Sequence, residues 1–540
     1  MNPKVITPAR FPMHGGLDLA QPALTPPSAP VNLPIFPSYC VALNERPGLP
    51  AQPVVAVGQH VLRGELIAQQ SHALNSPVHA PSSGVITQLH QSAPHQPITQ
   101  IEIASDGEDQ AQPQAHADVN ALSSAECLAR LTQAGVVGLG GAGFPLLAKV
   151  QRRAPHTLIV NAVECDPWQS ADVSVLIHQL DAVLLGITAL CRCWPGVQVI
   201  LAVKALPSHT QASLQAHHCA PTLQVHSVSA RYPSGGERQL VQQLLGQTLR
   251  PHQHSAELGI LCCNLQTVVA AGAAVQANAP VISRVTTLAG EQLQWQGQVN
   301  LRNGTRAQDV LQWAGYQTSA APVFINGLMM GQPLATRMQP LGKTTTALLA
   351  PSPTQWPTAP EPDPCIRCGA CAEVCPEHLK PQELWRTLSA SDHSAAAAYQ
   401  LDACILCSAC NWVCPSHIPL AQTFAQGQQH WHQHQAQQAR AAQAQQRFEQ
   451  RQLRLAATSA AQAERRARRA AQAAQRQVAL PATNAQPAPS EATEALAAKL
   501  ASAEQKLALA TPAERKAMQM TVRKLQQQLA RLQQEPPSDA

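Results

Sequence analysis

The sequence predicts a multidomain α/β protein. Its 540 residues correspond to three or four domains at about 150 residues each. Helical and strand-like patterns alternate over residues 113–270, which favours helices layered on a mostly parallel sheet. Cysteines cluster near residue 400, and the chain then becomes rich in Ala, Gln and Arg. We divide the chain into residues 1–112, 113–280, 281–350, 351–422 and 423–540.

The first segment is predicted to form a small β-sandwich. Strand-like runs at Val54–Val57, Val61–Ala68 and Gly84–Leu89 are separated by Gly, Pro and Ser. The stretch Asn75–Gly84 resembles the hairpin of lipoyl and biotinyl carrier domains, which present a modifiable lysine at the turn. This stretch holds no lysine. A packing role is therefore favoured over a swinging arm.

The second segment, residues 113–280, is predicted to form the α/β domain. Ser123-Ser-Ala-Glu126 is a capping box that begins a helix, and Gly135 ends it. A glycine-rich loop follows, then an amphipathic stretch and the apolar run Thr157–Val163. The run Val197–Val203 is a second buried strand pattern. Repeated helix–strand units of this kind are typical of a parallel sheet.

The remaining segments differ sharply in composition. Residues 281–350 have the pattern of short strands and turns punctuated by glycines. A Pro-rich linker at 351–364 leads into the cysteine region, which ends at residue 422. The tail beyond it is low in complexity and is predicted to be partly helical or disordered. Beyond a break at Pro481–Pro489, two segments have helical spacing, Leu496–Leu507 and Met518–Leu532, the second after a start pattern at Thr511-Pro-Ala-Glu514. Together they fit a helical hairpin or a short coiled coil.

Composition, charge and cysteine content limit the classes to which the protein can belong. Apolar residues make up 45% of the chain, which is ordinary for a globular protein, and the composition excludes collagen, a disulfide mini-protein and a polytopic membrane protein. Charged residues (13%) and aromatic residues (3%) are both few. Residues 425–540 contain 16 Lys or Arg and 8 Asp or Glu, so the tail carries +8 and the rest −3. Met1–Arg10 has no apolar core of a signal peptide. We expect a cytoplasmic protein whose 16 cysteines are thiols or metal ligands.

Two cysteine runs carry the strongest functional pattern. Each has the spacing C-x2-C-x2-C-x3-C-P of bacterial ferredoxins, in which three cysteines hold one 4Fe–4S cube and the fourth holds the other. A pair of zinc knuckles is the alternative, but zinc needs neither the third cysteine nor the trailing proline. The predicted ligands are Cys365, Cys368, Cys371 and Cys414 for cluster one, and Cys404, Cys407, Cys410 and Cys375 for cluster two. Two such clusters make a one-electron relay.

A glycine-rich loop is the second functional pattern. Gly138-Leu-Gly140-Gly-Ala-Gly143 fits G-x-G-x-x-G, whose glycines let the backbone approach a phosphate. A plain tight turn remains open as the alternative, because a helix and a two-residue apolar step precede the loop rather than a clear strand. Gly342-Lys343-Thr344 is not a phosphate loop, since Arg337 stands where glycine is required.

Two patterns in the tail could be functional sites or simply solvent-exposed helix surface. His430-Trp-His432-Gln-His434 could bind a metal, but a solvated polar helix is favoured. The basic run Arg465–Arg469 could meet nucleic acid or anionic lipid. No aromatic residue is interleaved in it, so a solvated helix face is favoured and no nucleic acid is expected.

These motifs together resemble the RnfC (also called RsxC) family of the Rnf electron-transport complex over residues 1–422. The resemblance rests on Phe11-Pro-Met-His-Gly-Gly16, Val54–Gly84, Gly135–Pro145, Asn161-Ala-Val-Glu-Cys-Asp-Pro167, Tyr232-Pro-Ser-Gly-Gly-Glu237 and both cysteine runs. The middle is also similar to the NADH-oxidising flavoprotein of respiratory complex I. The resemblance implies a barrel-sandwich hybrid at 1–112, a Rossmann-like FMN and NADH domain at 113–280, and an SLBB β-grasp domain at 281–350.

The resemblance also implies the residues of a flavin and NADH site. Glu164 and Glu237 take catalytic positions. The implied cofactor-binding residues are Gly138, Gly140, Gly141, Ala142, Gly143, Phe144, Lys149, Asn161, Asp166, Tyr232, Gly235, Gly236, Asn264 and Thr267. The chain departs from the flavoprotein at Leu139, where the relative has arginine, and at Gln266, where it has glutamate.

The function implied by the resemblance is that of a peripheral electron-transfer subunit of an ion-translocating oxidoreductase complex. Electrons would pass between NADH, through FMN, and partner subunits through two 4Fe–4S clusters. The implied partners are the integral and peripheral Rnf subunits at the cytoplasmic face of the inner membrane, with ferredoxin or a redox-sensing iron–sulfur protein. The alternatives are a non-enzymatic iron–sulfur adaptor and a soluble NADH dehydrogenase subunit. The tail beyond Gln422 is expected to be dispensable for electron transfer.

Overall fold

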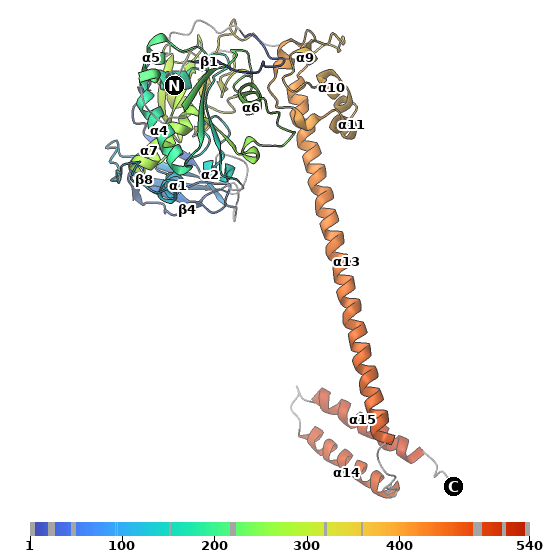
Figure 1. The fold of residues 1–540 in the computed structure, drawn as a ribbon. Coiled ribbons are helices and arrows are strands. Elements are labelled where there is room, and N and C mark those ends of the chain that lie inside the picture. Colours follow the sequence, from blue (N-terminus) through green and yellow to red (C-terminus); the bar gives the residue numbers. More distant parts are fainter. Residues whose placement is uncertain are drawn as a thin grey trace. The chain divides into compact units, whose positions relative to one another are not determined.

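The structure, a computed structural model, forms two compact units, Met1–Ala436 and Gln437–Ala540, which we describe separately (Figure 1). It describes residues 6–19, 28–44, 50–91, 93, 96–150, 153–216, 223–317, 321–357, 360–478, 489–509 and 515–534. The predicted helix start at Thr511–Glu514 lies outside these residues.

The N-terminal region is a β-sandwich, as predicted. Its two sheets enclose a core that includes Tyr39, Ile67 and Ile101. The four-stranded sheet has the order β3 (Ser38–Ala42), β9 (Ile98–Ser105), β8 (Gly84–Gln91), β5 (His60–Val61), and the other β4 (Gln52–Pro53), β6 (Leu66–Gln69), β7 (Val78–His79). Alternate residues of β9 point into this core, which is the pattern of a strand buried on one face.

Two strand predictions in this region need correction. Val54–Val57 is not a strand, because a turn forms where the Gln59 N–H donates to the Ala56 carbonyl at 3.1 Å. Val61–Ala68 is divided between β5 and β6 by a turn at Gly64, whose φ of +87° suits glycine.

The α/β domain is built on a five-stranded parallel sheet. The strand order is β1 (Thr7–Pro8), β12 (Leu223–Ser227), β11 (Gln198–Val203), β10 (Thr157–Ala162), β13 (Ile260–Asn264). Leu158 and Val160 face one core, whereas Ile159 between them faces the other. Burial of both faces explains why these strands are continuous apolar runs rather than alternating ones.

Helices cover both faces of this sheet (Figure 1). The first face carries α1 (Ser124–Gln133), α3 (Ala171–His178), α4 (Leu180–Cys193) and α7 (Leu265–Ala277), and the second carries α6 (Glu237–Leu245). The predicted capping box of α1 is present, since Ser123 and Glu126 exchange hydrogen bonds of 3.3 and 2.8 Å. Gly135 follows the helix at φ +66°, as expected for a helix end.

Two glycines bring α4 and α7 into direct contact. A Cβ added to Gly186 would lie 2.1 Å from the Val268 carbonyl oxygen, and one on Gly272 would lie 2.8 Å from the Gly186 nitrogen. Neither position therefore has room for a side chain. This close packing fixes the position of α7.

Residues 281–350 contribute most of a mixed six-stranded sheet. Its order is β18 (Gln332–Pro333), β17 (Phe324–Ile325), β20 (Ala347–Leu349), β14 (Ser283–Ala289), β15 (Gly297–Arg302), β2 (Val31–Asn32). Helix α8 (Ala307–Trp313) shares a core with it through Val310 and Leu311. Lys343 is not in a phosphate loop, as predicted. Its buried ammonium donates to the carbonyl oxygens of Gly135 at 3.0 Å and Pro77 at 3.5 Å.

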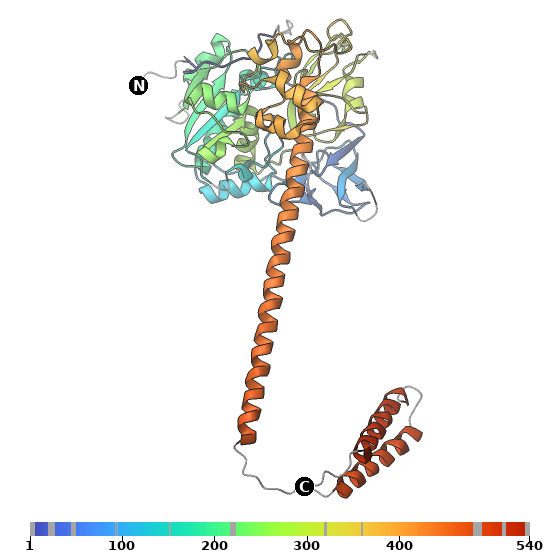
Figure 2. The ribbon, with the colours of Figure 1, turned by 90° about the vertical axis from the view of Figure 1, so that its right-hand side faces the viewer.

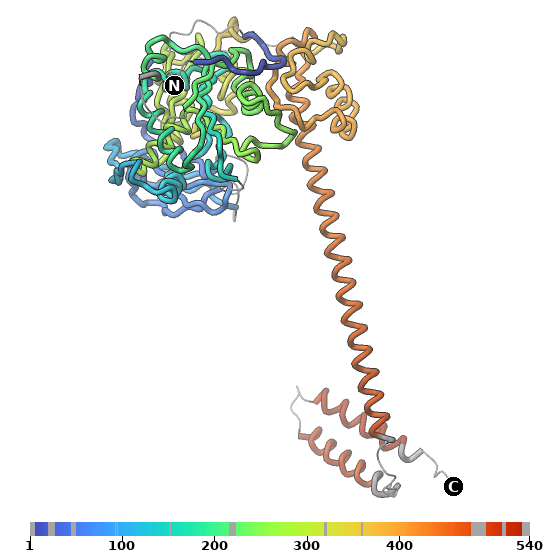
Figure 3. The backbone as a smooth tube through the Cα atoms, viewed as in Figure 1, coloured from blue at the N-terminus to red at the C-terminus, as the bar shows by residue number. Residues whose placement is uncertain are grey.

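The cysteine region is a set of short helices gathered around the first turns of a long one (Figure 3). They are α9 (Ala370–Glu373), α10 (Pro381–Ser389), α11 (His393–Ala398), α12 (Ala409–Trp412) and α13 (Leu420–Val478). The compact unit continues beyond the predicted boundary at Gln422, because Phe424 is 1% exposed in this core. Gln428 adds two hydrogen bonds of 2.9 Å, to the carbonyls of Leu401 and Cys404.

The second unit consists of helices. The later part of α13 is exposed on all sides, whereas α14 (Pro489–Ala508) and α15 (Arg515–Gln534) lie side by side (Figure 2). Gln526 of α15 donates to Glu504 of α14 at 3.1 Å, and Val522 is buried. Within the described part of the chain, no single helix is long and apolar enough to span a membrane. The pair α3 and α4, bent by 94°, meets that criterion only in combination.

Candidate functional site

The glycine-rich loop is a closed turn between α1 and the short helix α2 (Leu146–Lys149). The Gly138 N–H donates to the Phe144 carbonyl at 2.8 Å, and the Gly143 N–H donates to the Gly138 carbonyl at 3.0 Å. Gly141 and Gly143 have φ of +102° and +60°, which only glycine adopts easily. Across the described residues 123–150 no strand precedes the loop, so it differs from the strand–loop–helix dinucleotide fingerprint.

The loop is anchored at one end and open at its tip. Leu139 is buried, and its N–H donates to the Thr267 hydroxyl at 2.8 Å, near the start of α7. A Cβ on Gly140 would lie 3.1 Å from Asn264, whereas one on Gly141 meets no heavy atom within 4 Å. The backbone from Gly140 to Ala142 is exposed. Bare backbone beside open space is what close approach of a phosphate or ring requires.

The loop lies at the carboxyl edge of the parallel sheet. Asn161 at the end of β10 is the register partner of Asn264 at the end of β13. The chain runs from β10 through β11 to β12 on one side and returns to β13 on the other. Ligands of open α/β sheets bind in the crevice where the strand order reverses in this way.

The turn before α6 closes one side of this crevice. Asn161 donates from Nδ2 to the Gly235 carbonyl at 2.9 Å, which ties that turn to the end of β10. A Cβ on Gly235 would lie 2.2 Å from the Val163 carbonyl oxygen, so the contact requires glycine. Gly236 is the N-cap of α6. Lys149, at the end of α2, donates to the Cys262 carbonyl in the middle of β13 at 3.3 Å.

The carboxylates predicted in the site bind backbone amides. Glu164 accepts from the Val173 N–H at 3.0 Å, and burial together with the neighbouring charge of Asp172 raises its pKa. Glu237, in the first turn of α6, accepts from the Ser255 N–H at 3.0 Å. Both side chains stabilise local backbone in this structure.

Asp166 joins the α/β domain to the following one. Its carboxylate accepts from the N–H groups of Leu328 and Met329 at 3.2 and 3.3 Å. Burial raises the pKa of Asp166 to about 6. The residue therefore orders the loop that follows β17.

Tyr232 has different contacts from those that the resemblance implies. Its ring is 2% exposed, and its hydroxyl donates to the Cys407 carbonyl at 2.7 Å. Leu17, Met329 and Ala409 pack in the same cluster. Tyr232 thus faces the cysteine region rather than the glycine loop.

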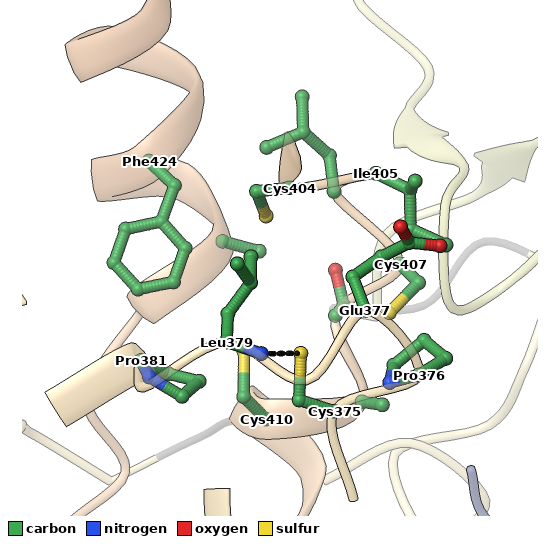
Figure 4. A pocket seen from close by; sticks show the side chains of 14 residues that line it. Cys375, Pro376, Glu377, Leu379, Pro381, Cys404, Ile405, Cys407, Cys410 and Phe424 are labelled. Atoms are coloured by element: carbon green, nitrogen blue, oxygen red, sulfur yellow. Dashed lines mark hydrogen bonds between the residues drawn. The ribbon is translucent and has the colours of Figure 1, made fainter. Parts of the chain in front are cut away.

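Eight cysteines gather into two pockets. One pocket is lined by Cys375, Cys404, Cys407 and Cys410, and the other by Cys365, Cys368, Cys371 and Cys414. We call them the inner and the outer cysteine pocket. Each combines three cysteines of one run with the fourth of the other. In Figure 4 the sulfur atoms of the inner pocket surround one space, and the Leu379 N–H donates to Cys375 Sγ at 3.4 Å.

The donor chemistry of both pockets fits a 4Fe–4S cube, which takes four cysteine thiolates. Burial raises the pKa of Cys404 to about 12 and that of Cys407 to about 11. The inner pocket by itself therefore favours neutral thiols. An iron centre bound there would supply the positive charge that holds these cysteines as thiolates.

The two pockets differ in their surroundings. The inner pocket adjoins the α/β domain through Tyr232 and through Glu377, whose carboxylate pairs with Arg238 of α6 at 2.9 Å. In the outer pocket, Cys368 is exposed and the neighbouring Ile366 is 69% exposed. One pocket therefore lies against the α/β domain, while the other opens to the surface of the unit.

A buried polar network lies beneath the loop, and it was not predicted from the sequence. Gln266 donates to Asp172 at 2.9 Å and exchanges bonds of 3.0 and 2.8 Å with the backbone of Val285. Arg284, 4% exposed, donates to the carbonyls of Leu139 and Lys343. A lone aspartate in the apolar helix α3 was the one pattern that could have indicated it.

Family models match three regions of the chain. They are the RnfC barrel sandwich hybrid domain at residues 12–108, the Nuo51 FMN-binding domain at 131–273 and the 4Fe–4S dicluster domain at 361–418. These matches support FMN and iron–sulfur clusters as cofactors. A flavin module and a dicluster module on one chain define a class, the flavo-iron–sulfur electron-transfer proteins.

Relatives with curated names show to which family of such proteins the chain belongs. Proteins named as the C component of the ion-translocating oxidoreductase complex are 39% identical in Pseudomonas aeruginosa, 36% in Citrobacter koseri and 35% in Yersinia pestis. The matches cover 78%, 82% and 82% of this chain, and 56%, 64% and 73% of those relatives. The chain belongs to their family, the RnfC components of ion-translocating oxidoreductase complexes. It spans little more than half the length of the Pseudomonas relative.

A solved chain titled NAD+-reducing nickel–iron hydrogenase in the H2-reduced state is 18% identical. The match has a TM-score of 0.41 and covers 58% of this chain and 62% of that one.

Proposed function

We propose that this chain passes electrons between NADH, through FMN, and partner subunits through two 4Fe–4S clusters. The observation that carries the proposal is the gathering of eight cysteines into two four-sulfur pockets, one of them against the α/β domain. The inner pocket would hold one cube and the outer pocket the other. When bound, a flavin exchanges two electrons with NADH and single electrons with iron–sulfur clusters.

The glycine loop and the strand ends are proposed to bind FMN and NADH. Gly140, Gly141 and Ala142 supply exposed backbone, and Asn161 and Asn264 flank the crevice at the reversal of strand order. The open space at Gly141 supports this fit. The buried network of Asp172, Gln266 and Arg284 would keep the loop in place. We propose a Rossmann-like assignment for residues 113–280 and an SLBB β-grasp assignment for 281–350.

The inner pocket is proposed as the cluster on the flavin side. Its contacts with Tyr232 and Arg238 support this assignment, because both residues belong to the α/β domain. The outer pocket, with Cys368 exposed, is suited to exchange with a partner protein. Single-electron transfer requires short separations, so the inner site would exchange electrons with the flavin and the outer site with the partner.

Partners and location are proposed from the family. Relatives carry the name of an ion-translocating complex, which supports integral and peripheral Rnf subunits as partners and a position at the cytoplasmic face of the inner membrane. Ferredoxin or a redox-sensing iron–sulfur protein would be the further electron partner.

The test is the visible spectrum of the anaerobically purified full chain before and after NADH. We expect flavin and iron–sulfur absorption together, with both bleached by NADH. A protein with eight irons, no flavin and no response to NADH would instead be the iron–sulfur adaptor. Recovery of all the native protein in the soluble fraction of gently lysed cells would contradict the membrane-complex assignment.

A further inference from the structure

We propose that His252, Asp402 and His432 form a binding site for one zinc ion. Their ligand atoms all lie within 4.8 Å of one another. Asp402 Oδ1 is 3.1 Å from His432 Nε2, and Asp402 Oδ2 is 3.4 Å from His252 Nε2. This site is separate from both cysteine pockets and does not depend on the proposed electron transfer.

The three ligands come from segments far apart in the sequence. His252 lies in a turn of the α/β domain, Asp402 on the short helix η2 (Leu401–Ala403) of the cysteine region, and His432 on α13. His252 adopts φ +61°, a conformation that is uncommon outside glycine. Two domains and a helix thus converge on one carboxylate.

The position of the carboxylate and of α13 is fixed by neighbouring contacts. The Asp402 side chain is 20% exposed. Gln428, one helical turn before His432, donates to the carbonyls on either side of Asp402, at Leu401 and Cys404, with bonds of 2.9 Å. The histidines, at 60% and 52% exposure, retain freedom to rotate toward a common centre. The site therefore has a half-buried carboxylate on a backbone segment held by Gln428, and two exposed imidazoles.

The ligand chemistry selects zinc among the common cations. Imidazole nitrogens suit zinc and other late transition metals, whereas Mg²⁺ and Ca²⁺ prefer oxygen ligands only. Zinc–ligand bonds of about 2.0–2.1 Å place tetrahedral ligands about 3.3 Å apart. Each histidine nitrogen lies near that spacing from one carboxylate oxygen of Asp402, His432 at 3.1 Å from Oδ1 and His252 at 3.4 Å from Oδ2. The two imidazoles must therefore turn to place both nitrogens and one carboxylate oxygen around a single centre. A water from solvent would complete the fourth position.

A neighbouring pair of histidines provides a rival site and a matched control. His430 and His434 are four residues apart on α13, a spacing that can also bind metal. In this structure His430 contacts the ring of His393, and His434 stacks on Trp431. His432 alone of the three contacts Asp402 among the described contacts.

The experiment is a zinc titration of the purified full chain with its clusters intact, after treatment with a mild chelator. We expect one zinc per chain. Each of His252→Asn, Asp402→Asn and His432→Asn should weaken zinc binding at least tenfold, while His434→Asn leaves it unchanged. Iron content, measured on the same samples, should equal that of the unmodified protein in every case, which separates this site from damage to the clusters.

Hydrogen exchange provides a second readout on the same proteins. Zinc should slow amide exchange in residues 250–254 and 428–436, and His432→Asn should abolish that protection. Failure of the full chain to bind zinc overturns the proposal. Equal binding by His252→Asn, or loss of binding with His430→Asn and His434→Asn instead, also overturns it, because the zinc would then lie on the helix alone.

Discussion

Replacing Tyr232 with phenylalanine isolates one hydrogen bond between the α/β domain and the inner cysteine pocket. The ring remains packed beside Leu17 and Met329, while the 2.7 Å bond to the Cys407 carbonyl is lost. Because the hydroxyl and its partner are buried, the lost bond should lower the free energy of unfolding by about 1–3 kcal/mol. The lost hydroxyl is also a positive dipole end beside a ligand cysteine, so a cluster bound in the inner pocket should become harder to reduce.

Two measurements follow on the same variant. Denaturant unfolding reports the stability, and a redox titration followed by paramagnetic resonance reports each cluster. Tyr39→Phe is the matched control, because Tyr39 is fully buried in the β-sandwich and its hydroxyl accepts the Phe36 N–H at 3.1 Å. It should reduce stability similarly and leave both clusters unchanged.

Two outcomes for Tyr232→Phe would refute this reasoning. If Tyr232→Phe loses flavin while both cluster potentials stay at their normal values, the side chain belongs to the flavin wall that the family resemblance implies. Unchanged stability and unchanged potentials would show that the bond to Cys407 is not formed in solution.

Three further predictions concern the pockets, the loop and the tail. Cys414→Ala should weaken the cluster of the outer pocket and spare the inner one, as seen by paramagnetic resonance; damage confined to the inner cluster would disprove the crossed ligation. Gly143→Val, which places a branched residue at φ +60°, should lose flavin and NADH reactivity yet keep iron that dithionite reduces; a folded variant with normal flavin removes the loop from the site. Truncation after Ala436 should keep flavin and iron, whereas truncation after Gln422 removes Phe424 and should lose iron; equal iron in both truncations would contradict the extended boundary.

Local patterns in the sequence predicted local structure well. The capping box at Ser123, the helix end at Gly135 and the apolar strand at Thr157–Val163 all rest on rules that span a few residues, and the structure contains each. Spacing alone also predicted which cysteines would come together. In the ferredoxin pattern, the fourth cysteine of each run joins the three cysteines of the other run.

Contacts between distant segments could not be predicted in this way. The bond from Tyr232 to Cys407 joins residues 175 positions apart, and nothing near either residue indicates the other. Phe424 and Gln428 belong to a low-complexity helix by composition, yet they complete the core of the cysteine region. The strand predicted at Val54–Val57 failed because its propensity was outweighed by a turn stabilised from Gln59.

The buried ammonium of Lys343 has a consequence for acid sensitivity. It connects the β-sandwich at Pro77, the α/β domain at Gly135 and its own domain. Separating any of the three would leave the ammonium without one of its hydrogen-bond acceptors. Burial and this ammonium lower the pKa of the adjacent His79 from 6.5 to about 3. As pH falls below 6.5, His79 binds a proton in the unfolded chain but stays neutral in the folded one. The free energy of unfolding therefore declines as pH falls from 6.5 toward 3. The three domains should therefore come apart together in acid, with the junction as the first point of weakness.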